Sequence, residues 1–242
     1  MNQNALPVAI HPAELLWREM NSVIGPYPDK VVAVHRLIPG TAFFPGGLGL
    51  WMPDEIPPEI PTEQVLIVGQ DFNSLAVHER AFESRSEVGT SITWKNLLKI
   101  LDSSNLAPDR CFFTNFYMGL RRVGPETGKF PGARDKGFAS RCLKFFHRQL
   151  EILRPKLIIT LGLEPLRALA KPIFNLPVPE ALYHCAEIFP SVKLPHGVAV
   201  VVALMHPSAR KADVGRRTYH ALEGIDAQRS MIEDGIKHSL GL

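Results

Sequence analysis

Short, uninterrupted runs of apolar residues recur along the chain and are its clearest structural signal. They cover residues 65–68, 111–114, 157–161 and 198–204, and the first and third are followed by a glycine. None of the runs alternates apolar with polar side chains, so each is typical of a strand buried on both faces. The pattern predicts four strands at the centre of the fold.

Segments with helical spacing of apolar residues lie around these runs. The spacing predicts helices over residues 12–23, 93–103, 135–153, 164–170 and 216–236. Buried strands separated by helices are typical of a parallel sheet with helices on both faces. We therefore expect an α/β fold, a three-layer α/β/α sandwich around a central, mainly parallel four-stranded sheet, in a single domain over residues 1–242.

Two stretches rich in Pro or Gly interrupt the regular pattern. Residues 38–61 are typical of a long irregular connection, and residues 171–179 of a surface loop. Composition leaves two alternatives open for the first stretch, which either packs over the edge of the sheet or shapes a pocket.

Composition places the chain among ordinary globular proteins, with 45% hydrophobic and 21% charged residues. The formal net charge is only +3, so any attraction to nucleic acid must come from local clusters of Lys and Arg. The three cysteines show no C-x-x-C spacing, which argues against a metal ribbon, an iron–sulfur cluster or a disulfide framework. The longest aliphatic stretch, residues 198–205, is too short to span a bilayer. We expect a cytoplasmic protein without a membrane segment.

Polar residues follow three of the four predicted strands. Asp71, Asn115 and His206 each stand at or just beyond the end of an apolar run. Taken singly, each has a plain reading as a turn or strand-end residue. Because ligands of open α/β sheets bind beyond the carboxyl ends of the strands, we predict that the three side chains meet in one crevice.

Four motifs around these residues resemble those of the uracil-DNA glycosylase superfamily. VLIVGQDFNS resembles its strand followed by Gly-Gln-Asp, and ALMHPSAR its closing His-Pro-Ser motif. Between them, CFFTNFYMGLR resembles the strand that ends in the base-reading Asn, and LRPKLIITLG the strand that ends in Leu-Gly. The motifs keep the superfamily's order over residues 60–210. The resemblance implies an enzyme that flips a base out of DNA and hydrolyses its N-glycosidic bond, with no metal or cofactor.

The resemblance also implies a role for five residues. Asp71 stabilises the cationic sugar and orients the attacking water, and His206 stabilises the departing base through a hydrogen bond. Asn115 reads the edge of uracil with one donor and one acceptor. Gln70 holds a base carbonyl through its backbone N–H. Phe82 is the nearest candidate for the aromatic residue that follows the first motif in the superfamily and stacks on the flipped base.

The motifs depart from the best-known subfamily in two places. Phe72 and Asn73 follow Asp71, where that subfamily has Pro and a Tyr that excludes thymine. Ala209 and Arg210 follow His-Pro-Ser, where it has Pro and a Leu that fills the space of the flipped nucleotide. Exclusion of thymine by a Tyr is therefore not expected, and the contact with DNA is expected to differ.

Two basic groups flank the expected crevice. Arg121 and Arg122 begin a basic loop after Asn115, and Ser208 and Arg210 lie in the His-Pro-Ser segment. We predict that these four residues contact DNA. A solvated charged loop is the plain alternative.

The sequence as a whole favours a monomeric, monofunctional DNA-repair glycosylase. Its expected partner is DNA that contains a deaminated base, with uracil foremost, and its action would lie at the nucleoid in a bacterial cell. Three alternatives stay open: a non-catalytic binder of damaged or single-stranded DNA, a glycosylase for another deaminated base, and a hydrolase of free nucleosides.

Overall fold

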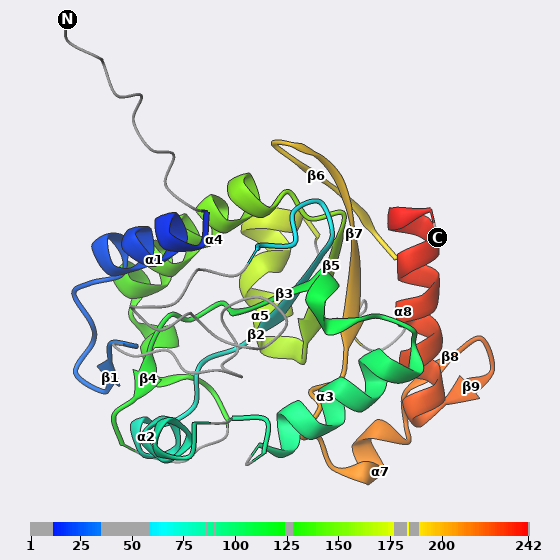
Figure 1. The fold of residues 1–242 in the computed structure, drawn as a ribbon, viewed down its shortest axis with the longest axis horizontal. Helices are drawn as coiled ribbons and strands as arrows, with labels where there is room; N and C mark the ends of the chain where they lie inside the picture. Colours follow the sequence, from blue (N-terminus) through cyan, green and yellow to red (C-terminus); the bar gives the residue numbers. More distant parts are fainter. Residues whose placement is uncertain are drawn as a thin grey trace, which may run out of the picture.

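A five-stranded sheet forms the centre of the computed structural model, which describes residues 12–34, 59–85, 87–89, 91–123, 128–176, 183 and 189–241 (Figure 1). Its strands are β2 (Val65–Gly69), β3 (Cys111–Asn115), β5 (Leu157–Leu161), β6 (Ser191–Leu194) and β7 (Gly197–Leu204). Their order across the sheet is β3-β2-β5-β7-β6. The four predicted strands run parallel, and β6 pairs antiparallel with β7 at the edge. The mainly parallel sheet is thus confirmed, with one strand more than predicted.

The additional strand, β6, follows a different sequence pattern from the others. Its residues alternate between exposed and buried, as is typical of a strand covered on one face only. β3 and β5, in contrast, are buried at every position. A search for uninterrupted apolar runs therefore passes over β6.

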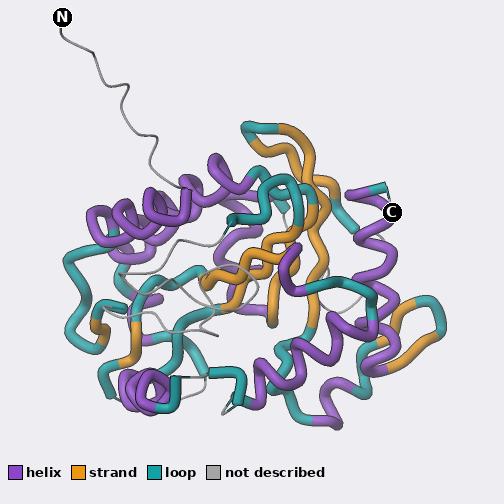
Figure 2. The backbone as a smooth tube through the Cα atoms, viewed as in Figure 1, coloured by secondary structure: helices purple, strands orange, loops and turns teal. Residues whose placement is uncertain are grey.

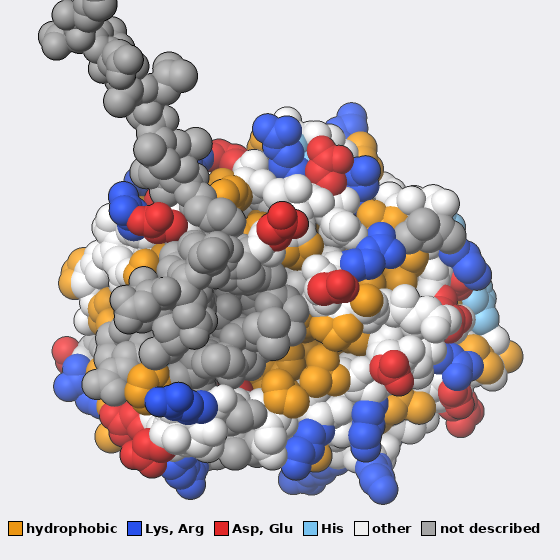
Figure 3. All heavy atoms as spheres, viewed as in Figure 1, with side chains coloured by type: hydrophobic (Ala, Val, Ile, Leu, Met, Phe, Trp, Pro, Cys, Tyr) orange, Lys and Arg blue, Asp and Glu red, His pale blue; other side chains and the backbone are white. Residues whose placement is uncertain are grey.

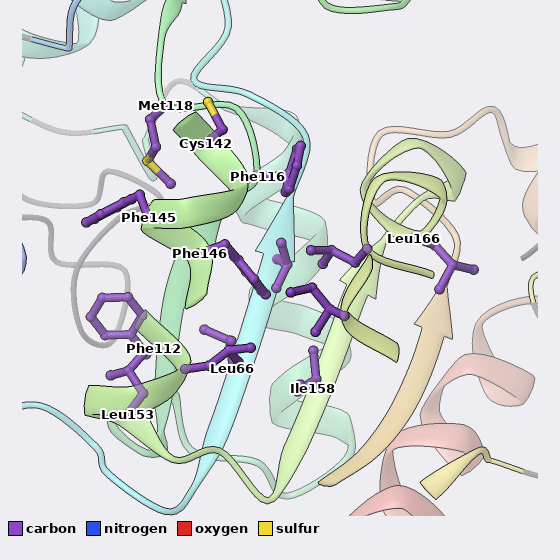
Figure 4. Packing of buried hydrophobic residues seen from close by; sticks show 14 of the residues in the cluster. Leu66, Phe112, Phe116, Met118, Cys142, Phe145, Phe146, Leu153, Ile158 and Leu166 are labelled. Carbon is purple, nitrogen blue, oxygen red and sulfur yellow. The ribbon is translucent and has the colours of Figure 1, made fainter. Parts of the chain in front are cut away.

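Helices cover both faces of the sheet, which confirms the predicted three layers. The helices over one face are α1 (Pro12–Val23), α4 (Lys136–Leu153) and α5 (Leu163–Leu169). Those over the other face are α3 (Ile92–Ser103) and α8 (Gly224–Leu240). Leu66, Phe112 and Ile158 face the first layer (Figure 4). Ile67 and Phe113, each one position further along, belong to the core beneath the second layer, as the alternation of side chains along a strand requires.

Local capping contacts fix where the longer helices begin and end. The side chain of Asp135 accepts a hydrogen bond from the Phe138 N–H at the start of α4, and Ser91 does the same for Trp94 at the start of α3. α4 ends at Leu153, and the next residue, Arg154, has a left-handed backbone with φ of 48°. The predicted starts of α3 and α4, and the predicted end of α4, agree with the structure to within one residue.

The second strand leads into a helix that the apolar pattern did not predict, α2 (Leu75–Glu83). Ser74 caps it by accepting a hydrogen bond from the Val77 N–H. Two short strands, β1 (Val31–Val32) and β4 (Leu120–Arg121), pair antiparallel beside it. Short helical turns, η2 (Pro108–Arg110) and η3 (Pro131–Arg134), precede β3 and α4.

The C-terminal segment begins differently from the prediction of one helix over residues 216–236. After the short α7 (Lys211–Val214), β8 (Thr218–Tyr219) and β9 (Leu222–Glu223) form a hairpin (Figure 2). His220 and Ala221, between the two strands, have φ of 47° and 61°, the backbone of a two-residue hairpin turn. A helix cannot contain that turn, so α8 starts only at Gly224.

The predicted surface loop over residues 171–179 also needs correction. Its first part forms η4 (Ala170–Phe174), in which Ile173 and Phe174 are buried. Residues 177–179, and most of the stretch over 38–61, lie outside the described residues. Within the described segments, no helix combines the length and the apolarity needed to cross a lipid bilayer.

Candidate active site

The carboxyl ends of the parallel strands define the edge where a ligand site is expected. The chain passes from β2 to β3 on one side and then returns to β5 on the other side of β2. Such a reversal opens a crevice between the two diverging connections. Asp71, Asn115 and His206 follow or end β2, β3 and β7 at this edge, so the structure brings the three predicted residues to one end of the sheet.

Asn115 lies directly beside Gly69, because the last residues of β3 and β2 are paired in register. Its side chain is buried, and a Cβ atom added to Gly69 would stand only 2.3 Å from its Oδ1. The amide of Asn115 therefore lies across the end of β2 in space that only a glycine leaves open. The motif thus has a glycine at this position because any side chain would overlap the amide of Asn115.

Asp71 is held in a tight turn between β2 and α2. Its Oδ1 accepts a hydrogen bond from the backbone N–H of Asn73 at 2.8 Å, and Asn73 is left-handed with φ of 71°. The Oδ1 of Asn73 in turn accepts from the Ser74 N–H at 2.7 Å. The residue that stands at the position of a thymine-excluding Tyr is therefore used to build the turn, and its neighbour Phe72 is buried in the core.

Arg121 binds the carboxylate of Asp71 with two hydrogen bonds. Its Nε lies 3.2 Å from Oδ1 and its Nη2 lies 2.8 Å from Oδ2. The side chains of Arg121 and Asp71 are only 3% and 7% exposed. We expected Arg121 at an exposed, DNA-contacting edge, and the structure instead buries it, whereas its neighbour Arg122 is exposed. Sequence reasoning missed this pairing, since no local pattern marks a buried ion pair.

His206 is oriented by the serine two residues further on. Its Nδ1 lies 2.8 Å from Ser208 Oγ and accepts a hydrogen bond from the Ser208 N–H at 3.2 Å. An accepting Nδ1 assigns the proton of the neutral ring to Nε2. Burial lowers the pKa of His206, and the nearby carboxylate of Asp71 opposes that shift. Ser208, which we expected to contact DNA, is thus seen to hold the imidazole.

Two neighbouring contacts fix the segment that carries His206. Asn96 of α3 donates a hydrogen bond to the Pro207 carbonyl at 2.7 Å. Gly162, at the end of β5, has φ of 90°, and a Cβ atom there would stand 3.3 Å from the Cβ of His206. The ends of β5 and β7 are therefore closely packed around the histidine.

Gln70 and Phe82 occupy different surroundings. The backbone carbonyl of Gln70 accepts from the Tyr117 N–H at 2.9 Å, and its side chain donates to the Gly128 carbonyl at 3.3 Å. Phe82 lies in the last turn of α2, about 10 Å along the helix from its start at a rise of 1.5 Å per residue. The structure thus ties Gln70 to the turn around Asp71 and places Phe82 near the end of α2.

Tyr117 is an aromatic residue of this region that sequence reasoning did not select. It follows Asn115 by two positions, is half-buried, and stacks on Phe130 with a centroid distance of 5.1 Å. Burial raises its pKa to about 12, and the nearby Cys142 thiol and the carboxylates of Glu164 and Asp71 act in the same direction. Its distance of two residues from Asn115 is the signal that could have drawn attention to it.

Basic side chains gather around the carboxyl edge of the sheet. In Figure 3, Lys and Arg side chains line the lower margin, where Figure 1 places α2, α3 and α7. Exposed basic residues of these elements and of the residue before α7 are Arg80, Lys95, Lys99, Arg210 and Lys211. This group, which we call the basic rim, is suited to contact phosphate groups.

Comparison with known proteins assigns the chain to a family. Residues 57–225 match the uracil DNA glycosylase superfamily, and the match covers the whole parallel sheet and the site. The chain therefore belongs to this superfamily, whose members are in general glycosylases that act on DNA in its repair. No curated protein matches the chain at a significant level.

Proposed function

We propose that the protein is a monomeric, monofunctional glycosylase that flips uracil out of DNA and hydrolyses its N-glycosidic bond, leaving an abasic site. The observation that carries the proposal is the convergence of Asp71, Asn115 and His206 at the carboxyl ends of three parallel strands. Family membership supports base removal from DNA, and the identity of the residues supports uracil as the base.

The chemistry of the reaction accounts for these residue types. Cleavage of the bond develops positive charge on the sugar and negative charge on the departing base. With its Nδ1 occupied by Ser208, a neutral His206 presents its Nε2–H to a carbonyl oxygen of the base. Asn115 offers both a donor and an acceptor to the opposite edge of uracil.

Asp71 would orient the water that attacks the sugar. Three hydrogen bonds from Asn73 and Arg121 occupy part of its carboxylate, and a carboxylate has about four acceptor positions. Oδ2, which takes one of the three, keeps acceptor capacity for a water molecule. A water held there would lie close to the crevice that receives the nucleotide.

One observation favours a second function, that of a non-catalytic binder of damaged or single-stranded DNA. The buried guanidinium of Arg121 neutralises the charge of Asp71, which reduces the electrostatic support that the carboxylate can give to a cationic sugar. The basic rim would serve such a binder equally well. Turnover therefore has to be measured separately from binding.

The test is alkali-coupled cleavage of labelled oligonucleotides beside gel retardation of the same DNA. Substrates carry uracil in single strands, opposite guanine and opposite adenine, with hypoxanthine and xanthine as further bases. We expect cleavage at uracil, and a loss of at least about 100-fold in Asp71→Asn and in His206→Ala. Retardation without cleavage would support the binder instead.

Matched controls make the same chemical changes away from the site. Asp109 lies in η2, before β3 and hence at the opposite edge of the sheet, and His147 is exposed on α4. Asp109→Asn and His147→Ala should cleave at the wild-type rate. Equal losses in the controls and in the site variants would remove the assignment of Asp71 and His206.

A further inference from the structure

We infer that Arg121 is a positioning residue, which serves base excision by holding the carboxylate of Asp71 in one orientation. The inference rests on the proposed function and adds a residue to it. Its basis is geometric: Arg121 and the turn of Asp71 bind each other through side chains and through backbone, at one buried place in the fold.

Hydrogen bonds hold both oxygens of the Asp71 carboxylate. Nε and Nη2 of Arg121 bind the two oxygens separately, at 3.2 and 2.8 Å. The Asn73 N–H adds a third bond to Oδ1 at 2.8 Å. Rotation of the carboxylate about its Cβ–Cγ bond would break all three contacts, so its plane is fixed. The direction in which Oδ2 presents its remaining acceptor capacity is fixed with it.

Arg121 is itself anchored by its backbone and by an aromatic ring. Its backbone N–H donates to the Asn73 carbonyl at 2.9 Å, and its strand β4 pairs with β1 through Val31. The guanidinium lies 5.7 Å from the centre of the Phe130 ring. Phe130 in turn stacks on Tyr117. Because the surrounding fold fixes Arg121, the hydrogen bonds of Arg121 also fix the position of the Asp71 carboxylate.

Arg121 also binds the segment that leads into η3. Nη2 of Arg121 also donates to the Gly128 carbonyl at 2.7 Å, and the Gln70 side chain donates to the same carbonyl at 3.3 Å. Nη1 lies 3.5 Å from the Lys129 carbonyl. The guanidinium of Arg121 thus links the carboxylate of Asp71 to the carbonyl of Gly128, which the side chain of Gln70 also binds.

A lysine cannot reproduce this arrangement. Its ammonium group keeps the positive charge but has no planar fork that binds two carboxylate oxygens and a carbonyl at once. Arg121→Lys therefore keeps the positive charge beside Asp71 and removes only the forked hydrogen bonds. Since a displacement of about 1 Å at a reacting group lowers a rate by about 100-fold, we expect the single-turnover rate of uracil excision to fall by roughly 10- to 100-fold. The enzyme concentration that gives half of the maximal rate should stay within about threefold.

The experiment is a double-mutant cycle of wild type, Arg121→Lys, Asp71→Asn and the double variant, followed in single turnover to long times with excess enzyme. If Arg121 acts through Asp71, the double variant should be no slower than Asp71→Asn, within about twofold. Thermal melting of each variant shows that it is folded.

The matched control is Arg148→Lys. Arg148 binds Glu19 with its Nε and Nη2, both at 2.9 Å, in a fork between α4 and α1. This variant loses the same geometry away from the site and should excise uracil at the wild-type rate. An unchanged rate in Arg121→Lys, or losses that multiply in the double variant, would overturn the positioning role while excision by the wild type stands. A wild-type chain that excises no base would overturn the proposed function, and the positioning role with it.

Discussion

Gly69 shows how a single missing side chain shapes the crevice. A methyl group at this position would overlap Oδ1 of Asn115, the flexible end of a side chain, rather than the backbone of a neighbouring strand. The fold can therefore accept the group by moving the amide. That movement would disturb the residue that we expect to read the base.

Gly69→Ala should for this reason lower excision more than stability. We expect the rate on uracil to fall by about 10- to 100-fold, the size of one or two lost hydrogen bonds, with a melting temperature close to that of the wild type. Gly137→Ala is the control, because the nearest atoms to its added Cβ are side-chain ends of Arg141 and Asp135 at 3.3 Å. A normal rate in Gly69→Ala would show that Asn115 does not read the base from its present position.

His206 should make both activity and stability depend on pH in the acidic range. Burial lowers its pKa below the ordinary value near 6.5, so the unfolded chain binds a proton more tightly than the folded one. The free energy of unfolding therefore decreases as the pH falls from about 6.5, the ordinary pKa, toward the lower pKa of the folded state. A protonated Nδ1 would also face the Ser208 N–H, donor against donor.

We therefore expect urea unfolding at pH 7.5 and pH 5.5 to show a larger loss of stability in the wild type than in His206→Gln. Excision should persist somewhat below pH 6.5 and fall only when the histidine is protonated. Equal losses of stability in the two proteins would contradict the assignment of a neutral, partly buried imidazole.

At the scale of elements, α3 supports the segment that carries His206. The hydrogen bond from Asn96 to the Pro207 carbonyl joins the middle of the helix to the residue directly after the histidine. α3 itself is capped by Ser91 and packs on the sheet through Trp94 and Leu97. The helix thus acts as a fixed support for a short loop.

Asn96→Ala should loosen that loop. Loss of one hydrogen bond costs about 1 kcal/mol, and we expect excision to fall by severalfold while the DNA concentration for half-maximal rate changes little. Asp102→Ala, an exposed change on the same helix and outside the basic rim, is the control. Urea unfolding and single-turnover rates measured together check the prediction, and a normal rate in Asn96→Ala would contradict it.

At the scale of the whole molecule, the sequence predicts the sheet and its chemically important edge, because both follow from uninterrupted apolar runs. Residues 65–68 and 157–161 are short, uninterrupted and followed by glycine, as is typical of central strands, and Asp71 and His206 lie where such strands end. The ion pair of Arg121 with Asp71 depends on contacts between residues 50 positions apart, which no local pattern records. The hairpin at His220 and Ala221 escaped prediction because neither residue is the Gly, Asn or Asp that marks a two-residue hairpin turn.

Family membership and the arrangement of the site lead to one central claim, that the crevice beside Asp71, Asn115 and His206 removes uracil from DNA by hydrolysis. The most direct measurement is the release of free base from DNA that carries a single radiolabelled uracil, followed in single turnover by chromatography. We predict free uracil and an abasic strand in equal amounts with the wild type, and a rate at least about 100-fold lower in Asp71→Asn and His206→Ala. No free base from the wild type, or equal rates in all three proteins, would contradict the account.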